Sequence, residues 1–442
     1  MPEQEKNVEQ LATELKKATD SVKDLGEELK GKMANGEKGL EDLKGRVDEA
    51  LTTITDAKSR LDDIEQKMAR RGAGQEAEKS FITVYELVNQ ISQQEELMVA
   101  AMKEQENGSN EVLQAIKNIN EITLLIIFII STLSVGFLSP DRFFTFNNFM
   151  STLRQMPEFG ILALAMMFPI LTGGINLSIV TTATMSSIVS TYFLTGIISK
   201  QNPILAITLA ILLSLLISII AGFLNGYITA YIGVAAMLVT LGTTTLFEGI
   251  SLNLTKGGSI SGFPLMFSYI TTKNLFGTPV PFIIYLFFIA ISYLILHKSS
   301  LGTKILMLGC NETATRFSGI NTKKVILSTY IYSAILSAIS GIIMMSRYNS
   351  AKVDFGSSYL MQSITAVVLG GVSISGGHGN IIGTVIAVAI IQVISKGLNL
   401  INVDRNIVDI IMGIILITVL AIRYISKVLS DKSLISKRRN KN

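Results

Sequence analysis

The chain has 442 residues, of which 49% are hydrophobic, with one cysteine and two histidines. A single cysteine excludes a disulfide framework within the chain, and so few cysteines and histidines exclude a structural zinc site. Residues 1–121 carry 26 of the 34 acidic residues and a net charge of −9, whereas residues 122–442 carry a net charge of +13. Charges are costly inside a bilayer, so membrane spans exclude them and the loops keep mainly basic residues. The scarcity of acidic residues after residue 121 is therefore typical of a membrane protein.

Residues 1–80 are predicted to form soluble helices. Apolar residues recur there at three- and four-residue spacing, with a break at Asn35-Gly36 and an end at Arg70-Arg71, which favours a coiled coil. This stretch resembles the coiled-coil leader of some tailed-phage capsid proteins. We expect residues 81–121 to form an amphipathic helical linker. It is similar to the cytoplasmic helices of bacterial chemotaxis receptors, but the hairpin tip at which a kinase docks is missing. Two interpretations stay open for residues 1–121, an oligomerisation or docking module and an inert appendage.

Residues 122–425 are predicted to form an all-α, polytopic membrane domain, because a membrane helix needs about 20 apolar residues and such segments follow one another here. The segments are 122–139, 157–172, 178–198, 204–231, 234–254, 280–297, 325–346, 360–374, 380–397 and 405–424. Basic residues gather between Lys298 and Lys324 and again in the tail 426–442. Cytoplasmic loops are rich in Lys and Arg, so we expect both termini in the cytoplasm and residues 347–359 outside.

Two short segments are broken by glycine, Gly173-Gly174-Ile-Asn-Leu-Ser and Gly370-Gly371-Val-Ser-Ile-Ser-Gly-Gly-His-Gly. Such paired breaks are typical of a transport pathway in a protein built from two halves, and five helices per half would give an inverted repeat. The alternative is that these glycines only permit close helix packing. The predicted pathway residues are Gly174, Asn176, Ser178, Asn225, Gln362, Gly370, Gly371 and Ser375.

The polar residues of the predicted spans are mostly neutral amides and hydroxyls, which suit an uncharged polar solute such as a sugar. The alternative for most of the Ser and Thr side chains is a hydrogen bond to the preceding helical turn. Glu248 is interpreted as the only acid within a span. The first rival function is an ion-coupled secondary carrier, but it would need a buried ionisable site, and the scarcity of acids within the spans argues against it. The second rival is a membrane-anchored receptor or structural protein.

Three motifs resemble the permease subunits of ribose-type ATP-binding-cassette importers, in the branched-chain amino acid and ribose permease superfamily. They are residues 173–178, residues 308–320 and residues 366–379, and the resemblance extends over 122–425. It implies a transporter subunit in the inner membrane for a monosaccharide, autoinducer-2 or a nucleoside, although Asn176 stands where sugar permeases commonly carry Asp. The implied partners are a cytoplasmic ATPase, an extracytoplasmic solute-binding protein and a second permease copy or paralogue.

The sequence contains no phosphate-binding loop of its own, so ATP hydrolysis is expected on a separate subunit. We predict no catalytic residue, cofactor, metal site or nucleic-acid partner. Besides these protein partners, the only one expected is membrane lipid.

A short helix is predicted within residues 309–320. Asn311 is suited to cap its start, and Glu312 lies in the first turn, where the helix dipole favours an anion. Arg316 follows Glu312 at a spacing that supports a helix, and Ser318-Gly319 can end it. The resemblance places the ATPase-contacting helix here, so these five residues are predicted to couple ATP hydrolysis to transport. The alternative is that Glu312 and Arg316 form only an exposed ion pair.

Overall fold

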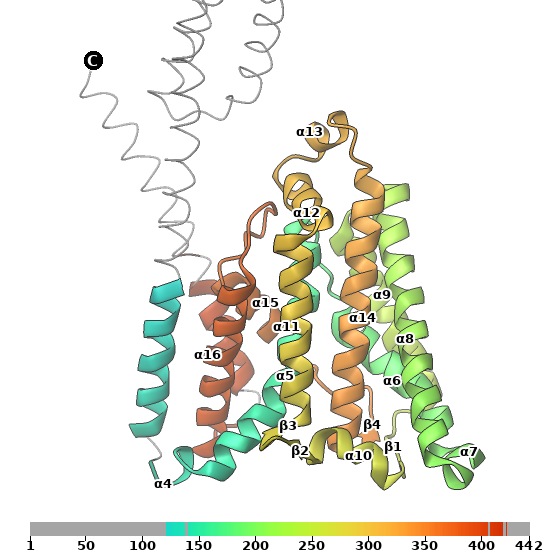
Figure 1. Ribbon diagram of the computed structural model, residues 1–442, viewed down its shortest axis with the longest axis vertical. Helices are drawn as coiled ribbons and strands as arrows, with labels where there is room; N and C mark the ends of the chain where they lie inside the picture. The colour runs from blue at the N-terminus through green and yellow to red at the C-terminus, as the bar shows by residue number, and fades with distance from the viewer. Residues whose placement is uncertain (1–120, 138–139, 405–406, 419–420, 422–442) are drawn as a thin grey trace, which may run out of the picture. The chain divides into compact units, whose positions relative to one another are not determined.

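A computed structural model describes residues 121–137, 140–404, 407–418 and 421, which all belong to one compact unit. The predictions for residues 1–80, for nearly all of 81–121 and for the tail 426–442 lie outside the described residues. The described part is mostly helical (Figure 1). Its strands are two residues long and form two antiparallel pairs, β1 (Ile260–Ser261) with β4 (Ser350–Ala351) and β2 (Asn274–Leu275) with β3 (Thr278–Pro279).

Each apolar segment predicted from the sequence coincides with a helix. In chain order the helices are Glu121–Phe137, α4 (Pro140–Phe143), α5 (Phe146–Leu171), α6 (Ile179–Thr195), α7 (Ile197–Gln201), α8 (Pro203–Tyr227), the π-helix η1 (Ile228–Ile232), α9 (Ala236–Thr255), α10 (Leu265–Thr272), α11 (Val280–Lys298), α12 (Ser300–Cys310), α13 (Glu312–Phe317), α14 (Thr322–Tyr348), α15 (Tyr359–Leu369), α16 (Ile381–Leu400) and Ile407–Thr418. Within the described residues, four helices are long and apolar enough to cross a membrane: α8 with η1, α11, α14 and α16.

Two helix boundaries differ from the prediction for physical reasons. Helix α5 begins at Phe146, well before residue 157, and continues through Pro157 and Pro169. Its first turns are polar, so hydropathy alone misses them. Helix α15 ends at Leu369 rather than residue 374, because Gly371 has a positive φ of 97° that a right-handed helix cannot contain.

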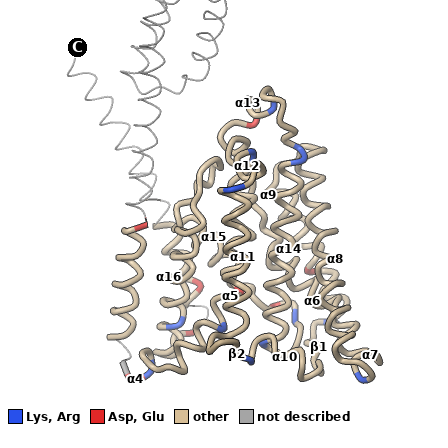
Figure 2. The backbone as a smooth tube through the Cα atoms, viewed as in Figure 1, with Lys and Arg blue, Asp and Glu red and all other residues tan. Residues whose placement is uncertain are grey.

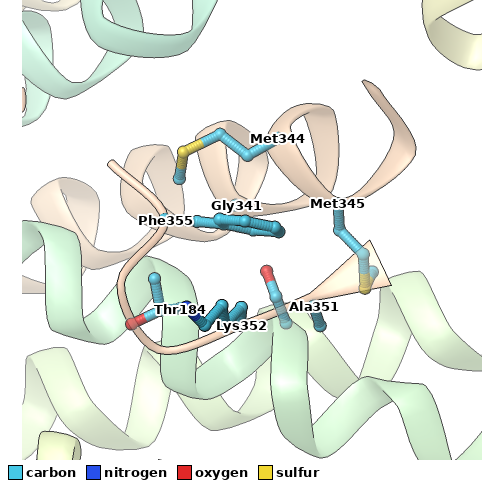
Figure 3. A pocket seen from close by; sticks show the side chains of 8 residues that line it. Thr184, Gly341, Met344, Met345, Ala351, Lys352 and Phe355 are labelled. Carbon is cyan, nitrogen blue, oxygen red and sulfur yellow. The ribbon is translucent and has the colours of Figure 1, made fainter. Parts of the chain in front are cut away.

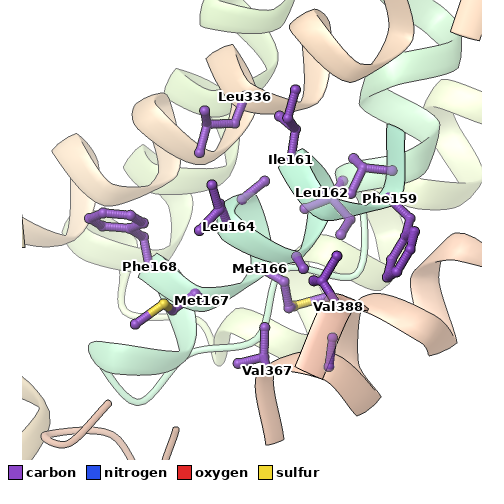
Figure 4. Packing of buried hydrophobic residues seen from close by; sticks show 14 of the residues in the cluster. Phe159, Ile161, Leu162, Leu164, Met166, Met167, Phe168, Leu336, Val367 and Val388 are labelled. Atoms are coloured by element: carbon purple, nitrogen blue, oxygen red, sulfur yellow. The ribbon is translucent and has the colours of Figure 1, made fainter. Parts of the chain in front are cut away.

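Helix α5 forms the centre of the core, since it is buried continuously from Met156 to Leu171. It packs against α11, α14, α15 and α16. Figure 4 shows side chains of α5, among them Leu164 and Met166, packed with Leu336 of α14, Val367 of α15 and Val388 of α16. A helix segment that is buried all round must be positioned by its neighbours, so the C-terminal end of α5 lies where several helices meet, whereas its first residue, Phe146, is exposed.

Helices α5 and α15 run parallel. At one end, the ring of Tyr359 lies 6.1 Å from that of Phe159, and at the other end Gly377 N, just beyond α15, donates to Leu171 O at 3.0 Å. The two glycine-broken segments therefore follow helices that point the same way, and they contact each other. Our expectation that they mark inverted halves was wrong, because inverted equivalents would point in opposite directions.

Helix α14 runs antiparallel to α5. Arg347, near its C-terminal end, pairs with Glu158, and Ser333, near its middle, bonds to Asn176 just after α5. Helices α12 and α13 lie at the end of the helices where α5 stops, opposite β1 and β4 (Figure 1). Lys and Arg residues occur at both ends (Figure 2), so charge within the described residues does not by itself assign a side of the membrane.

Candidate functional site

The two glycine-broken helix ends close by the same motif. After α5, Gly173 N donates to Ile170 O and Gly174 N to Pro169 O, both at 2.9 Å, and Gly173 has a φ of 83°. After α15, Gly371 N donates to Val368 O at 3.1 Å and Val372 N to Val367 O at 3.2 Å. This is the Schellman arrangement, with a left-handed glycine just past each helix. Aligning the two sequence segments pairs Gly173 with Gly370. In the structure, the equivalent of Gly173 is instead Gly371, one residue later.

Beyond α5, a buried polar network holds the broken segment in place. Asn176 Oδ1 accepts from Ser178 N at 3.1 Å and from Ser178 Oγ at 2.8 Å, and Asn176 Nδ2 donates to Ser333 Oγ at 3.0 Å. Asn225 Nδ2 in α8 donates to Ser178 Oγ at 2.8 Å. All four side chains are buried. The structure thus brings together three of the predicted pathway residues and adds Ser333, which lies too far away in the sequence to be recognised.

Two polar atoms beside this network have no partner among the described residues. They are Asn225 Oδ1 and the hydroxyl of Tyr330, and both are buried. Gly174 is placed against that hydroxyl, since a methyl group at Gly174 would lie 2.7 Å from it. Helix α9 contributes as well, because Thr240 Oγ1 donates to Ile175 O at 3.0 Å. The free acceptor and the free hydroxyl are the groups in this region that can bind a further polar molecule.

The remaining predicted pathway residues belong to α15 and to the loop that follows it. Gln362 is buried in α15, and no hydrogen bond among the described residues joins it to the Asn176 network. Gly370 touches the backbone of α16, since a methyl group there would lie 2.5 Å from Thr384 N. Gly371 ends α15, and Ser375 is exposed in the following loop. Apart from Gln362, which lies near the start of α15, the predicted set therefore forms two groups at adjacent helix ends.

The helix predicted within residues 309–320 is present as α13. Asn311 Oδ1 accepts from Ala314 N at 3.0 Å, which confirms the N-cap, and Ser318 follows the last helical residue. Gly319 adopts a φ of 78°, as a helix end requires. Within the described residues, Glu312 and Arg316 form no ion pair, so capping rather than charge pairing stabilises this helix.

Most hydroxyls of the membrane segment bond to their own helix, as the simpler interpretation predicts. Thr184 donates to Thr181 O, Thr244 to Thr240 O and Thr365 to Met361 O, at 2.7 to 3.2 Å. Such hydroxyls are satisfied within one helix. Ser178 differs because its hydroxyl links two other elements.

A buried charge network was missed in the sequence. Glu158 of α5 is 0% exposed and pairs with Arg347 of α14, whose Nη2 donates to Glu158 Oε2 at 2.8 Å. The hydroxyl of Tyr359, at the start of α15, donates to the same oxygen at 2.8 Å. Glu248 is exposed. The interpretation of Glu248 as the only acid within a span was wrong, since Glu158 lay inside the predicted span 157–172 and was the available signal.

One pocket lies away from both glycine-broken ends. It is lined by α6, α14, β4 and the segment after β4, and its lining is mostly apolar, with Met344, Met345 and Phe355 among the residues that Figure 3 labels. No predicted pathway residue lines it. Within the described residues, no group of three or more His, Cys, Asp or Glu side chains could hold a metal ion.

Comparison with known proteins identifies the family. The model of the family described as branched-chain amino acid transport system / permease component matches residues 148–420. The ribose import permease protein of Bacillus subtilis (strain 168) is 38% identical over 295 residues, which cover 66% of this chain and 88% of the relative. The chain belongs to this permease family.

A second relative agrees with this assignment. The autoinducer 2 import system permease protein of Yersinia pestis (strain Pestoides F) is 33% identical over 312 residues, which cover 69% of this chain and 91% of the relative. No solved structure matches the chain significantly. The resemblance inferred from the three motifs is confirmed. As a member of this permease family, the chain is a multi-pass membrane protein and a transporter subunit rather than an enzyme.

Proposed function

We propose that the chain forms the translocation pathway of an ATP-binding-cassette importer for a monosaccharide or a solute of similar polarity. Its relatives are named as permeases for ribose and for autoinducer 2. The observation that carries the proposal is the network of Asn176, Ser178, Asn225 and Ser333, because it is buried, neutral and rich in hydrogen-bonding groups. Neutral amides and hydroxyls can replace the water around a sugar hydroxyl without burying a charge.

The proposal assigns different parts to the predicted pathway residues. Asn176 and Ser178 hold the first broken segment in shape. Within the described residues, Asn225 offers its unpaired Oδ1 to the solute, and Gly174 leaves space beside the unpaired hydroxyl of Tyr330. At the second break, Gly370 and Gly371 shape the turn that leads to the exposed Ser375. Gln362 is buried near the start of α15, away from that turn. The proposed solute route passes along the C-terminal ends of α5 and α15.

The buried charges argue against the ion-coupled rival. Glu158 is neutralised by Arg347 and receives a further hydrogen bond from Tyr359, so it is not a vacant carboxylate for a proton or sodium ion. Uptake of labelled ribose into vesicles containing the permease, its ATPase and its solute-binding protein tests this. We expect uptake to require ATP and to survive ionophores that collapse ion gradients. Uptake that needs a gradient and not ATP would establish a secondary carrier instead.

We also propose ten membrane crossings in the inner membrane, with both termini in the cytoplasm. In an inverted 5+5 repeat, equivalent helices run in opposite directions. Helices α5 and α14 are long, buried and antiparallel, so the repeat we propose pairs α5 with α14 and α6 with α15. Helices α12 and α13 would then be cytoplasmic, and the segment 349–358 would face the solute-binding protein. In a Cys310→Ser background, an impermeant maleimide should label Lys352→Cys from outside and not Lys323→Cys. The opposite pattern would invert the topology.

Helix α13 is proposed to contact the ATPase through Asn311, Glu312, Arg316, Ser318 and Gly319. The helix is short, capped at both ends and mostly exposed, as a docking element should be. Arg316→Glu should lower ATP-driven uptake while membrane insertion stays normal. Lys200→Glu, a reversal at α7 near the opposite end, is the matched control, and equal loss in both variants would refute the docking assignment.

A second permease copy is proposed to cover the outer face of α9. Glu248 and Thr245 are exposed there, and a methyl group added at Gly242 or Gly249 would meet no atom within 4 Å. A carboxylate and small residues facing lipid are unfavourable, but they suit a helix interface or a water-filled route. Leucines such as Leu241 are exposed on α9 as well, but the exposed face of α8 has no carboxylate or glycine, with Leu212 and Leu216 exposed, and suits lipid. Thr245→Cys should cross-link two copies in a Cys310→Ser background, and Leu212→Cys should not.

A further inference from the structure

The C-terminal end of α12 packs directly against both glycine-broken helix ends. Gly309 lies in its last turn, where a methyl group would collide with Leu171 O and would approach Gly377 Cα to 3.0 Å. The next residue, Cys310, places its Sγ 3.7 Å from Gly377 O. The end of α12 therefore touches the end of α5 and the loop after α15 at one place.

The loop after α15 closes this contact with two glycines. A methyl group at Gly376 would lie 2.8 Å from Gly173 N and 3.0 Å from Gly309 Cα, and Gly377 N donates to Leu171 O at 3.0 Å. Both glycines have positive φ, 85° and 77°. Three backbones thus meet at distances that leave no room for a methyl group at Gly309 or Gly376, and we name residues 171–173, 309–310 and 376–377 the glycine junction. Glycine is required here for space as well as for backbone conformation.

Such a junction transmits displacement well. Side chains between two helices can change rotamer and absorb a small shift, whereas backbones in direct contact and joined by a hydrogen bond must move together. Helix α12 continues into α13 through Asn311 alone, whose side chain caps α13. A push on α13 therefore reaches the junction through a short and well-capped connection.

We propose that the glycine junction is the mechanical link that passes movement of α12 and α13 to both glycine-broken helix ends at once. The proposal rests on the proposed function, in which α13 contacts the ATPase. It gives a role to Gly309 and to Gly376-Gly377, which the pathway itself does not use. Gly309, Gly376 and Gly377 are positioning residues, because they act through the ends of α5 and α15.

The first test compares two glycines of equal conformation in the assembled complex of permease, ATPase and solute-binding protein. Gly377 and Gly277 both have a φ of 77°, but a methyl group at Gly277 has no atom within 4 Å, whereas one at Gly377 lies 2.6 Å from Cys310 Sγ. Gly377→Ala should keep the ATPase bound and its basal hydrolysis intact while lowering uptake about tenfold, a typical size for coupling between sites. Gly277→Ala should match the parent. Parent-level uptake by Gly377→Ala, or equal loss in both variants, would overturn the proposal.

A second test needs no glycine substitution, so it remains decisive if Gly377→Ala fails to fold. Cys310 is the only cysteine of the chain and is exposed, so its thiol can react with methyl methanethiosulfonate to form a methyl disulfide, with methanesulfinate as the leaving group, which places one methylthio group beside Gly377 O. The adduct should lower uptake with the ATPase still bound, and dithiothreitol should restore it. Cys310→Ser complexes treated alike should be unaffected.

The outcomes separate this proposal from the proposed function. A parent complex without ATP-dependent uptake would refute the proposed function. A working parent whose Cys310 adduct transports normally, or loses the ATPase, would refute the junction as the link.

Discussion

The two glycine-broken helix ends share one local motif but are held by different forces. After α5, the segment is fixed by side-chain hydrogen bonds from Asn176, Ser178 and Ser333. After α15, the segment is fixed by backbone contact, where Gly370 meets Gly383 and Thr384 of α16. The first end should therefore be sensitive to the loss of a polar partner, and the second to any added volume. A shared turn does not imply shared stabilisation, because the surroundings differ.

Away from these ends, the helices that carry them are tied together by charge. Glu158 of α5 binds both Arg347 of α14 and Tyr359 of α15. The parallel helices α5 and α15 are thus joined at one end by the Glu158 network and at the other by the glycine junction. Substitutions at each tie can show which of them sets the distance between the two helices.

The largest effect is expected from Arg347→Gln. It leaves Glu158, which is 0% exposed, as a buried charge with only Tyr359 as a side-chain donor, and such a loss costs about 3–5 kcal/mol. Thermal or chemical unfolding in detergent measures it. Lys352→Gln is the control, because it breaks an exposed pair with Asp354 at 2.6 Å worth less than about 1 kcal/mol. The double variant with Glu158→Gln should recover part of the loss, and its failure to do so would show that the pair is not the cause.

The next effect tests the first helix end. Asn176→Leu leaves Ser178 N and the hydroxyls of Ser178 and Ser333 without this partner, at a cost of about 3 kcal/mol, and should abolish uptake. Asn176→Asp is the matched control. Its carboxylate can still accept from Ser178 N and from the hydroxyls of Ser178 and Ser333, and these donors offset part of the cost of the buried charge, so the loss of stability and of uptake should be smaller than for Asn176→Leu. If both variants behave alike, hydrogen bonding at residue 176 does not hold this end.

A smaller effect tests the second helix end by volume alone. Gly383→Ala places a methyl group against Gly370 O, and the overpacking should cost about 2 kcal/mol. Gly413→Ala provides the control, since no atom lies within 4 Å there and alanine favours a helix by up to about 1 kcal/mol. The two variants should therefore shift the unfolding midpoint in opposite directions. A shift of the same sign would mean that close packing at Gly383 is not limiting.

The smallest effect is expected from deleting residues 2–115. The charge balance changes sharply near Ile122, and no site chemistry was found before it. We therefore propose that residues 1–121 are dispensable for transport, and uptake by the shortened permease should equal that of the full chain. Abolished uptake at normal membrane abundance would show that these residues regulate the permease.

Features that depend on neighbouring residues could be predicted from the sequence. Apolar runs located the helices, Asn311 and Gly319 marked the ends of α13, and glycine pairs marked the breaks. The three family motifs were recognised for the same reason, because each is a continuous stretch. Hydrophobic periodicity and capping are local signals, so they survive without a structure.

Tertiary structure alone decided how these elements meet. Glu158 and Arg347 are 189 positions apart, Asn176 and Ser333 are 157 apart, and Cys310 and Gly377 are 67 apart. No periodic pattern records such pairs, since each arises from the packing of whole helices. For the same reason, the parallel course of α5 and α15 could not be inferred from their similar glycine breaks. The sequence by itself determined which stretches form helices and where most of them end, while packing determined which ends touch and how each is held.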